Sequence, residues 1–79
     1  MIDIEALTQA LKNGSRQAFD SLYHYYFPQL YAYSLKCSKR TELAEEIMQE
    51  TFVQLWLSRA SIRETDKLDR LLIVIAHHK

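Results

Sequence analysis

The sequence predicts an all-α domain, folded as a compact bundle of three to five helices. Hydrophobic residues make up 48% of the 79-residue chain, which is too apolar for a disordered segment. One Gly and one Pro are too few turn formers for a many-stranded sheet, and apolar side chains recur every three or four residues. A chain of this length has room for one core, so we expect residues 1–79 to form a single domain.

The first predicted helix spans residues 3–13 and ends at a stop signal. Its apolar side chains recur at helical spacing, at Ile4, Leu7, Ala10 and Leu11. The following pair, Asn13 and Gly14, is typical of the left-handed backbone that ends a helix. The first helix is therefore expected to be short.

The second predicted helix is long and contains the proline. Ser15 can cap its start, and apolar residues then keep steps of three and four from Phe19 to Cys37. Pro28 has no backbone N–H and crowds the preceding turn. It therefore predicts either a kink or a junction between two helices near Phe27.

A third helix is predicted from Thr41, followed by Glu42, to about Ser58. At about 100° per residue, one arc of this helix is apolar and is expected to pack inward: Ala44, Ile47, Met48, Thr51, Phe52 and Leu55. The opposite arc holds Glu46, Gln49, Glu50 and Val53. We expect Trp56 to close one end of the bundle against the second helix.

The last part of the chain is predicted to be a loop followed by a fourth helix. Residues 58–65 have no helical pattern, and Thr65 or Asp66 can cap a helix that runs to Lys79. Its inward positions are Leu68, Leu71, Leu72, Ile75 and Ala76. Ile73 and Val74 fall off this arc, which suggests that they pack on something outside the chain: DNA, a linker or a protein partner. Without a stop signal in this helix, we expect the chain to be a fragment of a longer protein.

The formal net charge of zero is a sum of three unlike segments. Residues 1–41 hold five Lys/Arg and three Asp/Glu (+2), residues 42–50 hold four Glu and no basic residue (−4), and residues 51–79 hold five and three (+2). In the acidic segment, Glu46, Gln49 and Glu50 lie side by side on a helix, with Glu42 one turn earlier. They could dock a partner rich in Arg or Lys, or form a solvated polar face.

Several function classes are excluded at this stage. Cys37 is the only cysteine in the sequence, so no disulfide can form within the chain. Asp3 and Glu5 stand where a signal peptide would be basic. We therefore expect the protein to be located in the reducing cytoplasm. The longest apolar run, residues 71–76, is too short to span a membrane. His77 and His78 are adjacent and point about 100° apart on a helix, so they cannot easily bind one metal ion. We expect no metal site and no other cofactor. The residue types provide no nucleophile, base and oxyanion set, so we expect no enzyme.

Four stretches, in order, resemble region 2 of bacterial extracytoplasmic-function (ECF) sigma factors: residues 18–23 (AFDSLY), 30–31 (LY), 44–56 (AEEIMQETFVQLW), and 72 with 75–76. The most specific is 44–56, which keeps the order and spacing of the family's acidic block. The resemblance implies a helical domain that acts in transcription initiation. It also implies that Glu46, Gln49 and Glu50 bind core RNA polymerase, at the clamp helices of its largest subunit. We expect Glu42, one helical turn earlier, to belong to the same polymerase-binding surface.

The resemblance also implies a DNA-binding part after this block, which opens the minus-10 promoter element and holds a flipped base of the non-template strand. The candidate DNA-binding residues here are Arg59, Arg63, Lys67, Arg70, His77, His78 and Lys79. Positive side chains can meet phosphates. The sequence departs from the family in this part, because Leu68, Leu71 and Ile73 replace aromatic residues and His77-His78 replaces Arg-Asn. Base stacking on the fourth helix is expected to be weaker as a result.

Other functions remain open from the sequence. The chain could be a helical protein-interaction module that binds polymerase or an anti-sigma factor without melting DNA. It could also be a free-standing interaction domain that shares only its packing with the family. Sigma factors of this group carry a second helical domain, region 4, which reads the minus-35 element. The resemblance implies that this domain is absent from residues 1–79.

Overall fold

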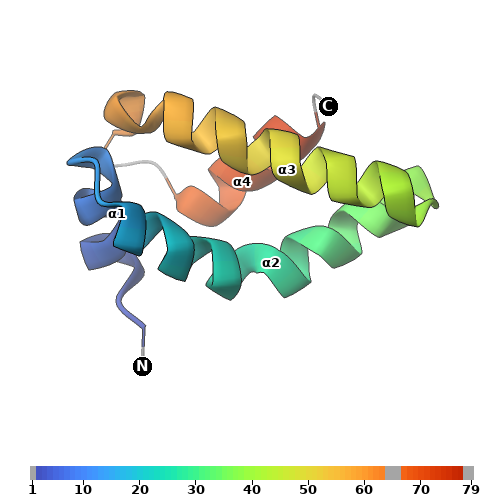
Figure 1. The fold of residues 1–79 in the computed structure, drawn as a ribbon, viewed down its shortest axis with the longest axis horizontal. Coiled ribbons are helices and arrows are strands. Elements are labelled where there is room, and N and C mark those ends of the chain that lie inside the picture. The colour runs from blue at the N-terminus through green and yellow to red at the C-terminus, as the bar shows by residue number, and fades with distance from the viewer. Residues whose placement is uncertain (1, 64–66, 78–79) are drawn as a thin grey trace.

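Two long antiparallel helices form the frame of the molecule, α2 (Arg16–Ser38) and α3 (Thr41–Leu57), as Figure 1 shows. The computed structural model describes residues 2–63 and 67–77. In these residues α1 (Ile4–Lys12) packs on α2, a 3-10 helix η1 (Arg59–Ser61) follows α3, and α4 (Leu68–His77) packs on α3 and α2. The described chain is therefore an all-α bundle, as the sequence predicts.

The first two helices begin and end where their sequence signals lie. The Oδ1 atom of Asp3 accepts a hydrogen bond of 3.0 Å from the N–H of Ala6, which caps α1. Gly14 has φ +90, which favours glycine, and its N–H donates to the carbonyl of Leu11. The Oγ atom of Ser15 accepts from the N–H of Ala18 at 3.0 Å and caps α2. Both predicted boundaries are confirmed.

Pro28 lies inside α2, and the helix continues through it. Of the two predicted outcomes, the junction between separate helices is wrong. Figure 1 shows α2 bent near its middle, as expected when an interior proline removes a backbone hydrogen bond. Pro28 is exposed, so the bend places its ring on the outside of the bundle.

α3 begins at Thr41 and ends at Leu57, close to the predicted bounds. Thr41 is the first helical residue, and the capping position belongs to Arg40, whose side chain makes no capping hydrogen bond. The chain reaches this position through Lys39, which has a left-handed φ of 61 and closes α2 with a 2.7 Å hydrogen bond from its N–H to the carbonyl of Leu35. This tight turn leaves Thr41 already within the helix.

The segment after α3 is more ordered than the loop predicted for residues 58–65. Arg59–Ser61 forms a 3-10 turn, and Ile62 is buried in the core at 3% exposure. One inward apolar residue is too weak a periodic signal to show this from the sequence. The predicted caps Thr65 and Asp66 lie outside the described residues, as do His78 and Lys79.

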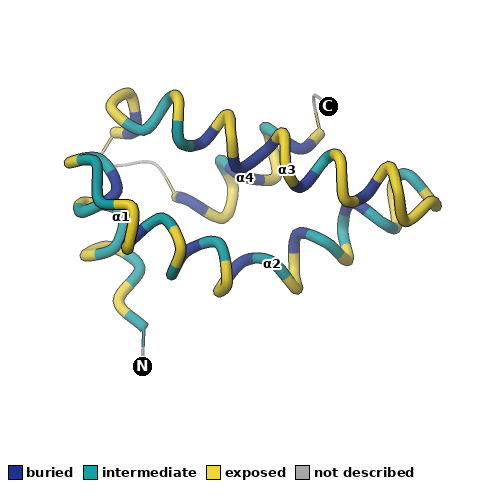
Figure 2. The backbone as a smooth tube through the Cα atoms, in the orientation of Figure 1, coloured by how far each residue is buried: buried dark blue, intermediate teal, exposed yellow. Residues whose placement is uncertain are grey.

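The core is built from the inward faces of all four helices together with Ile62. The fully buried large side chains include Leu11 of α1, Leu22 of α2, Leu55 of α3 and Leu72 of α4. Figure 2 shows the buried positions turned toward the centre of the bundle. The predicted inward positions of α3 and α4 are confirmed, since each of them is buried or partly buried. No helix among the described residues is long and apolar enough to span a lipid bilayer.

Candidate functional site

A row of polar side chains on the outside of α3 forms the first candidate surface. We call it the α3 ridge and define it as Glu42, Glu46, Gln49 and Glu50, all of which are exposed. The opposite face of α3 buries Met48, Phe52 and Leu55 in the core, so the ridge is held outward by the packing of its own helix. The sequence pattern predicted this arrangement.

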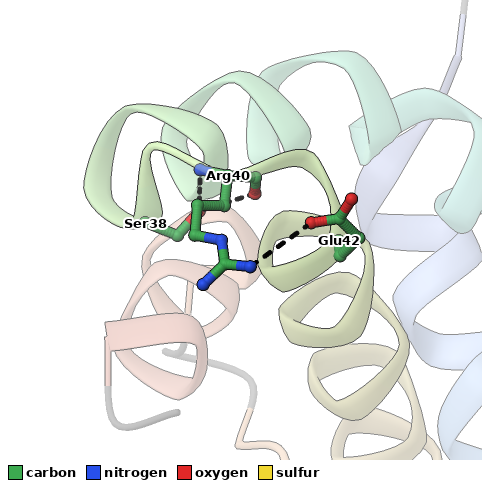
Figure 3. A network of polar contacts seen from close by, with 3 residues as sticks. All are labelled: Ser38, Arg40 and Glu42. Atoms are coloured by element: carbon green, nitrogen blue, oxygen red, sulfur yellow. Dashed lines mark hydrogen bonds and ion pairs between the residues drawn. The ribbon is translucent and has the colours of Figure 1, made fainter.

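Most side chains of the α3 ridge form no polar contact with another described residue. Among the described residues, no hydrogen bond or ion pair involves the side chains of Glu46, Gln49 or Glu50. Glu42 forms an ion pair with Arg40, with 3.8 Å between Oε2 and Nη2 (Figure 3). Both side chains are mostly exposed, and such pairs contribute little stability. The ridge can therefore accept charge-assisted hydrogen bonds from an Arg- or Lys-rich partner.

Arg59, the first candidate DNA-binding residue, folds back onto α3. Its guanidinium carbon lies 4.0 Å from the ring centroid of Trp56, and its Nη1 atom donates a 2.8 Å hydrogen bond to the backbone carbonyl of Trp56. Arg16 of α2 lies 5.5 Å from the same ring centroid. The ring also packs edge-on against Phe19 of α2, with centroids 5.4 Å apart. The predicted packing of Trp56 against the second helix is thereby confirmed.

Arg63 and Lys67 line one cleft of about 950 Å³ between α1 and the start of α4. Among the described residues that line this cleft, three are basic and three are acidic, so their charges balance: Lys12, Arg63, Lys67, Asp3, Glu5 and Asp69. A phosphate at Arg63 or Lys67 would therefore also meet nearby carboxylates. The cleft is less positive than the sequence of residues 51–79 alone indicates.

Tyr26 lies at the inner wall of this cleft and is 7% exposed. Burial, followed by the nearby Asp69 carboxylate and by Tyr25, raises the pKa of the Tyr26 phenol above its usual value. The phenol therefore stays neutral at physiological pH and can act as a hydrogen-bond donor or acceptor toward the cleft.

Two further candidates, Arg70 and His77, lie on α4 and are exposed. His77 is at the far end of the helix, where its Nδ1 atom is 3.4 Å from the hydroxyl of Tyr33. Tyr33, Cys37 and His77 line a separate small cavity of about 140 Å³. A hydrogen bond with Cys37, and then burial, raise the pKa of Tyr33. The structure thus brings Arg63 and Lys67 together in one cleft, while Arg59 and His77 contact other parts of the fold.

Sequence reasoning missed the residues that α1 contributes to the cleft. Asp3, Glu5 and Lys12 line it beside Arg63 and Lys67, although more than fifty residues separate the two groups in the sequence. The periodicity of α1 predicts its apolar side, but it contains no signal for which other helix its polar side faces. The cleft could therefore be found only from the packed structure.

The histidines offer little chemistry for a metal ion in this part of the chain. His24 is hydrogen-bonded through Nδ1 to the carbonyl oxygen of Asp20 at 2.8 Å. No group of three or more His, Cys, Asp or Glu side chains suited to a metal ion occurs within residues 2–63 and 67–77. The surfaces that remain are the α3 ridge and the basic side chains that follow it.

Comparison with known proteins gives one match. The family model of sigma-70 region 2 matches residues 22–79, which include most of α2, the α3 ridge and the basic side chains after it. α1 lies outside the match. Neither the curated proteins nor the solved structures gave a significant match.

Proposed function

The chain belongs to the sigma-70 region 2 family, and we propose that it is a region 2 domain of the ECF group. In this role it tethers core RNA polymerase through the α3 ridge and presents basic side chains to the minus-10 promoter element. The ECF assignment is supported by residues 44–56, whose order and spacing are similar to the acidic block of that group. We expect it to act in the cytoplasm, with residues 1–79 folded as one domain.

One observation carries this proposal: the α3 ridge is exposed and its central side chains have no partner within the described fold. Four glutamates within residues 42–50 raise the local negative charge without any basic residue in the same segment. A rigid helix that displays unpaired carboxylates favours a basic partner surface, because each new contact is a charge-assisted hydrogen bond. The basic clamp helices of the polymerase would fit this requirement.

We propose that the promoter-binding part depends chiefly on Arg70, which is exposed and does not fold back onto an aromatic ring as Arg59 does. Arg63 and Lys67 would assist from the cleft, and Lys79 would extend the positive surface. These basic side chains would make electrostatic contacts with phosphates of the non-template strand. His77 and His78, which are counted as neutral at pH 7, would add hydrogen bonds.

A second candidate is favoured by one feature of α4. Its exposed apolar side chains are the aliphatic Ile73 and Val74, and residues 68–79 contain no aromatic residue. Aromatic rings are what usually hold unstacked bases. The chain could therefore bind polymerase or an anti-sigma factor without melting DNA. Titration with single-stranded minus-10 DNA at low salt distinguishes the two candidates, since affinity supports promoter binding and its absence supports the interaction module.

The docking role is tested by titrating the 79-residue protein against a purified fragment of the polymerase clamp helices. We expect Glu50→Arg to weaken binding at least tenfold, because it replaces an attractive contact with a repulsive one, and Gln49→Ala to weaken it less. Asp20→Arg is the matched control, since it makes the same charge change at an exposed position on α2, outside the α3 ridge. Equal binding by wild type, Glu50→Arg and Gln49→Ala would contradict the docking role.

A further inference from the structure

Two large aliphatic side chains continue the line of the α3 ridge toward the end of the helix. Val53 is 57% exposed and Leu57 is 71% exposed, more than any other large hydrophobic side chain among the described residues. At about 100° per residue, both fall inside the same arc of about 100° that contains the ridge. The combined stripe from Glu42 to Leu57 is about 22 Å long.

The stripe changes chemistry along its length. Its first part carries the carboxylates of Glu46 and Glu50, and its last turn carries Val53 and Leu57, which are neighbours at i and i+4. Single exposed aliphatic residues are common on protein surfaces. Two that are adjacent, highly exposed and aligned with a charged row are instead typical of a protein-binding surface with separate polar and apolar parts.

The aliphatic pair is not needed for the packing of α3. The helix already buries Met48, Phe52 and Leu55 on its inner face, and Trp56 packs on Phe19 from the flank. Leu57 lies at the last residue of the helix with most of its side chain in solvent. The Leu57 side chain therefore points away from the core, and its exposed apolar surface is available to a partner.

We propose that Val53 and Leu57 form the apolar half of the polymerase-docking surface, with the α3 ridge as its acidic half. This inference rests on the proposed function and specifies its partner. The partner is a helical protein surface that presents Arg or Lys side chains opposite Glu46 and Glu50. About one to two helical turns further along, it presents aliphatic side chains opposite Val53 and Leu57. Because the acidic part and the aliphatic part lie at opposite ends of the stripe, the partner can bind along α3 in only one orientation.

A second copy of this chain fits the stripe poorly. If two α3 helices paired in parallel, their glutamates would face one another and repel. If they paired antiparallel, the carboxylates of one copy would be buried against Val53 and Leu57 of the other, at a high desolvation cost. Charge complementarity therefore favours a different protein with basic side chains.

The test compares the salt dependence of binding to the clamp-helix fragment for two kinds of variant. We expect Val53→Ser and Leu57→Ser each to weaken binding roughly tenfold, the effect of losing one buried aliphatic contact. This loss should be nearly equal at low and high salt. Glu50→Arg should instead change the slope of affinity against salt, because its contact is ionic. Tyr25→Ser, which removes another exposed large apolar side chain on α2, serves as the control.

The outcomes separate this inference from the docking role itself. If Glu50→Arg weakens binding while Val53→Ser and Leu57→Ser bind like wild type, the apolar half is wrong and the docking role stands. If no variant affects binding, both are wrong. If the serine variants change only the self-association of the chain, measured by sedimentation, the stripe is a homodimer surface and the inference is overturned. Circular dichroism of each variant checks that the fold is retained.

Discussion

At the level of single residues, Arg59 is a candidate DNA-binding residue whose side chain contacts another part of the same fold. Its guanidinium covers the face of Trp56 and donates to the carbonyl of the same residue. Such a contact combines a cation–π interaction with a hydrogen bond at the end of α3. Arg59 therefore holds η1 against α3.

We expect Arg59→Ala to lower the free energy of unfolding by about 1–2 kcal/mol, from the lost ring contact and hydrogen bond. Arg70→Ala removes an arginine of the same charge from an exposed position and should change the free energy of unfolding by less than about 0.5 kcal/mol. Urea denaturation monitored by Trp56 fluorescence measures both. Equal stability of the two variants would show that the Trp56 contact contributes nothing to the fold.

At the scale of secondary structure elements, the turn between α2 and α3 is closed without a side-chain cap on α3. Lys39 takes the left-handed conformation, and Arg40 has the extended backbone of a capping residue, with φ −141 and ψ 133. Ser38 supports the turn, since its Oγ atom donates to the carbonyl of Arg40 at 3.1 Å (Figure 3). The turn is thus stabilised locally, while the first N–H groups of α3 have no side-chain cap.

Arg40→Ser is expected to raise the free energy of unfolding by about 1 kcal/mol, because a serine hydroxyl at this position can accept from an N–H of the first turn. Arg40→Ala is the control, since it also removes the exposed ion pair with Glu42 but adds no cap. Thermal unfolding should rank the variants with serine above alanine. The reverse order would mean that the backbone at residue 40 does not permit capping.

At the scale of the whole molecule, all four helices depend on one small core. Leu55 is completely buried, and Leu57, two residues away on the same helix, is 71% exposed. A domain of this size buries a smaller share of its surface than a larger one, so its stability margin is narrow. The loss of one central side chain should therefore destabilise the whole bundle.

Leu55→Ala is expected to lower the free energy of unfolding by about 2–5 kcal/mol, the usual cost of a cavity in a core, which is enough to unfold a large fraction of the protein at 37 °C. Leu57→Ala makes the same chemical change at an exposed position and should cost less than about 0.5 kcal/mol. Chemical denaturation of both variants provides the measurement. A large loss for Leu57→Ala would mean that this side chain supports the fold rather than a partner.

The helices, their inward faces and the α3 ridge can be predicted from the amino-acid sequence alone. These features depend on positions three and four apart within one helix, so the inward Met48 and the outward Glu46 follow from periodicity alone. The match to sigma-70 region 2 covers the α3 ridge and all of these helices except α1 and the start of α2. The sequence around Pro28 predicts either a kink or a junction between two helices, and it does not choose between them, because neighbouring helices decide whether α2 survives the lost hydrogen bond.

The contacts of the basic side chains depend on how the helices pack against one another. Arg59 is held by Trp56, and Arg63 and Lys67 share a cleft with Asp3 and Glu5. His77 lies beside Tyr33, 44 residues away. Such contacts depend on how one helix lies on another, and spacing along the chain contains no information about that placement. For this reason the acidic surface could be assigned from one helix, whereas the positive surface required the packing of the whole bundle.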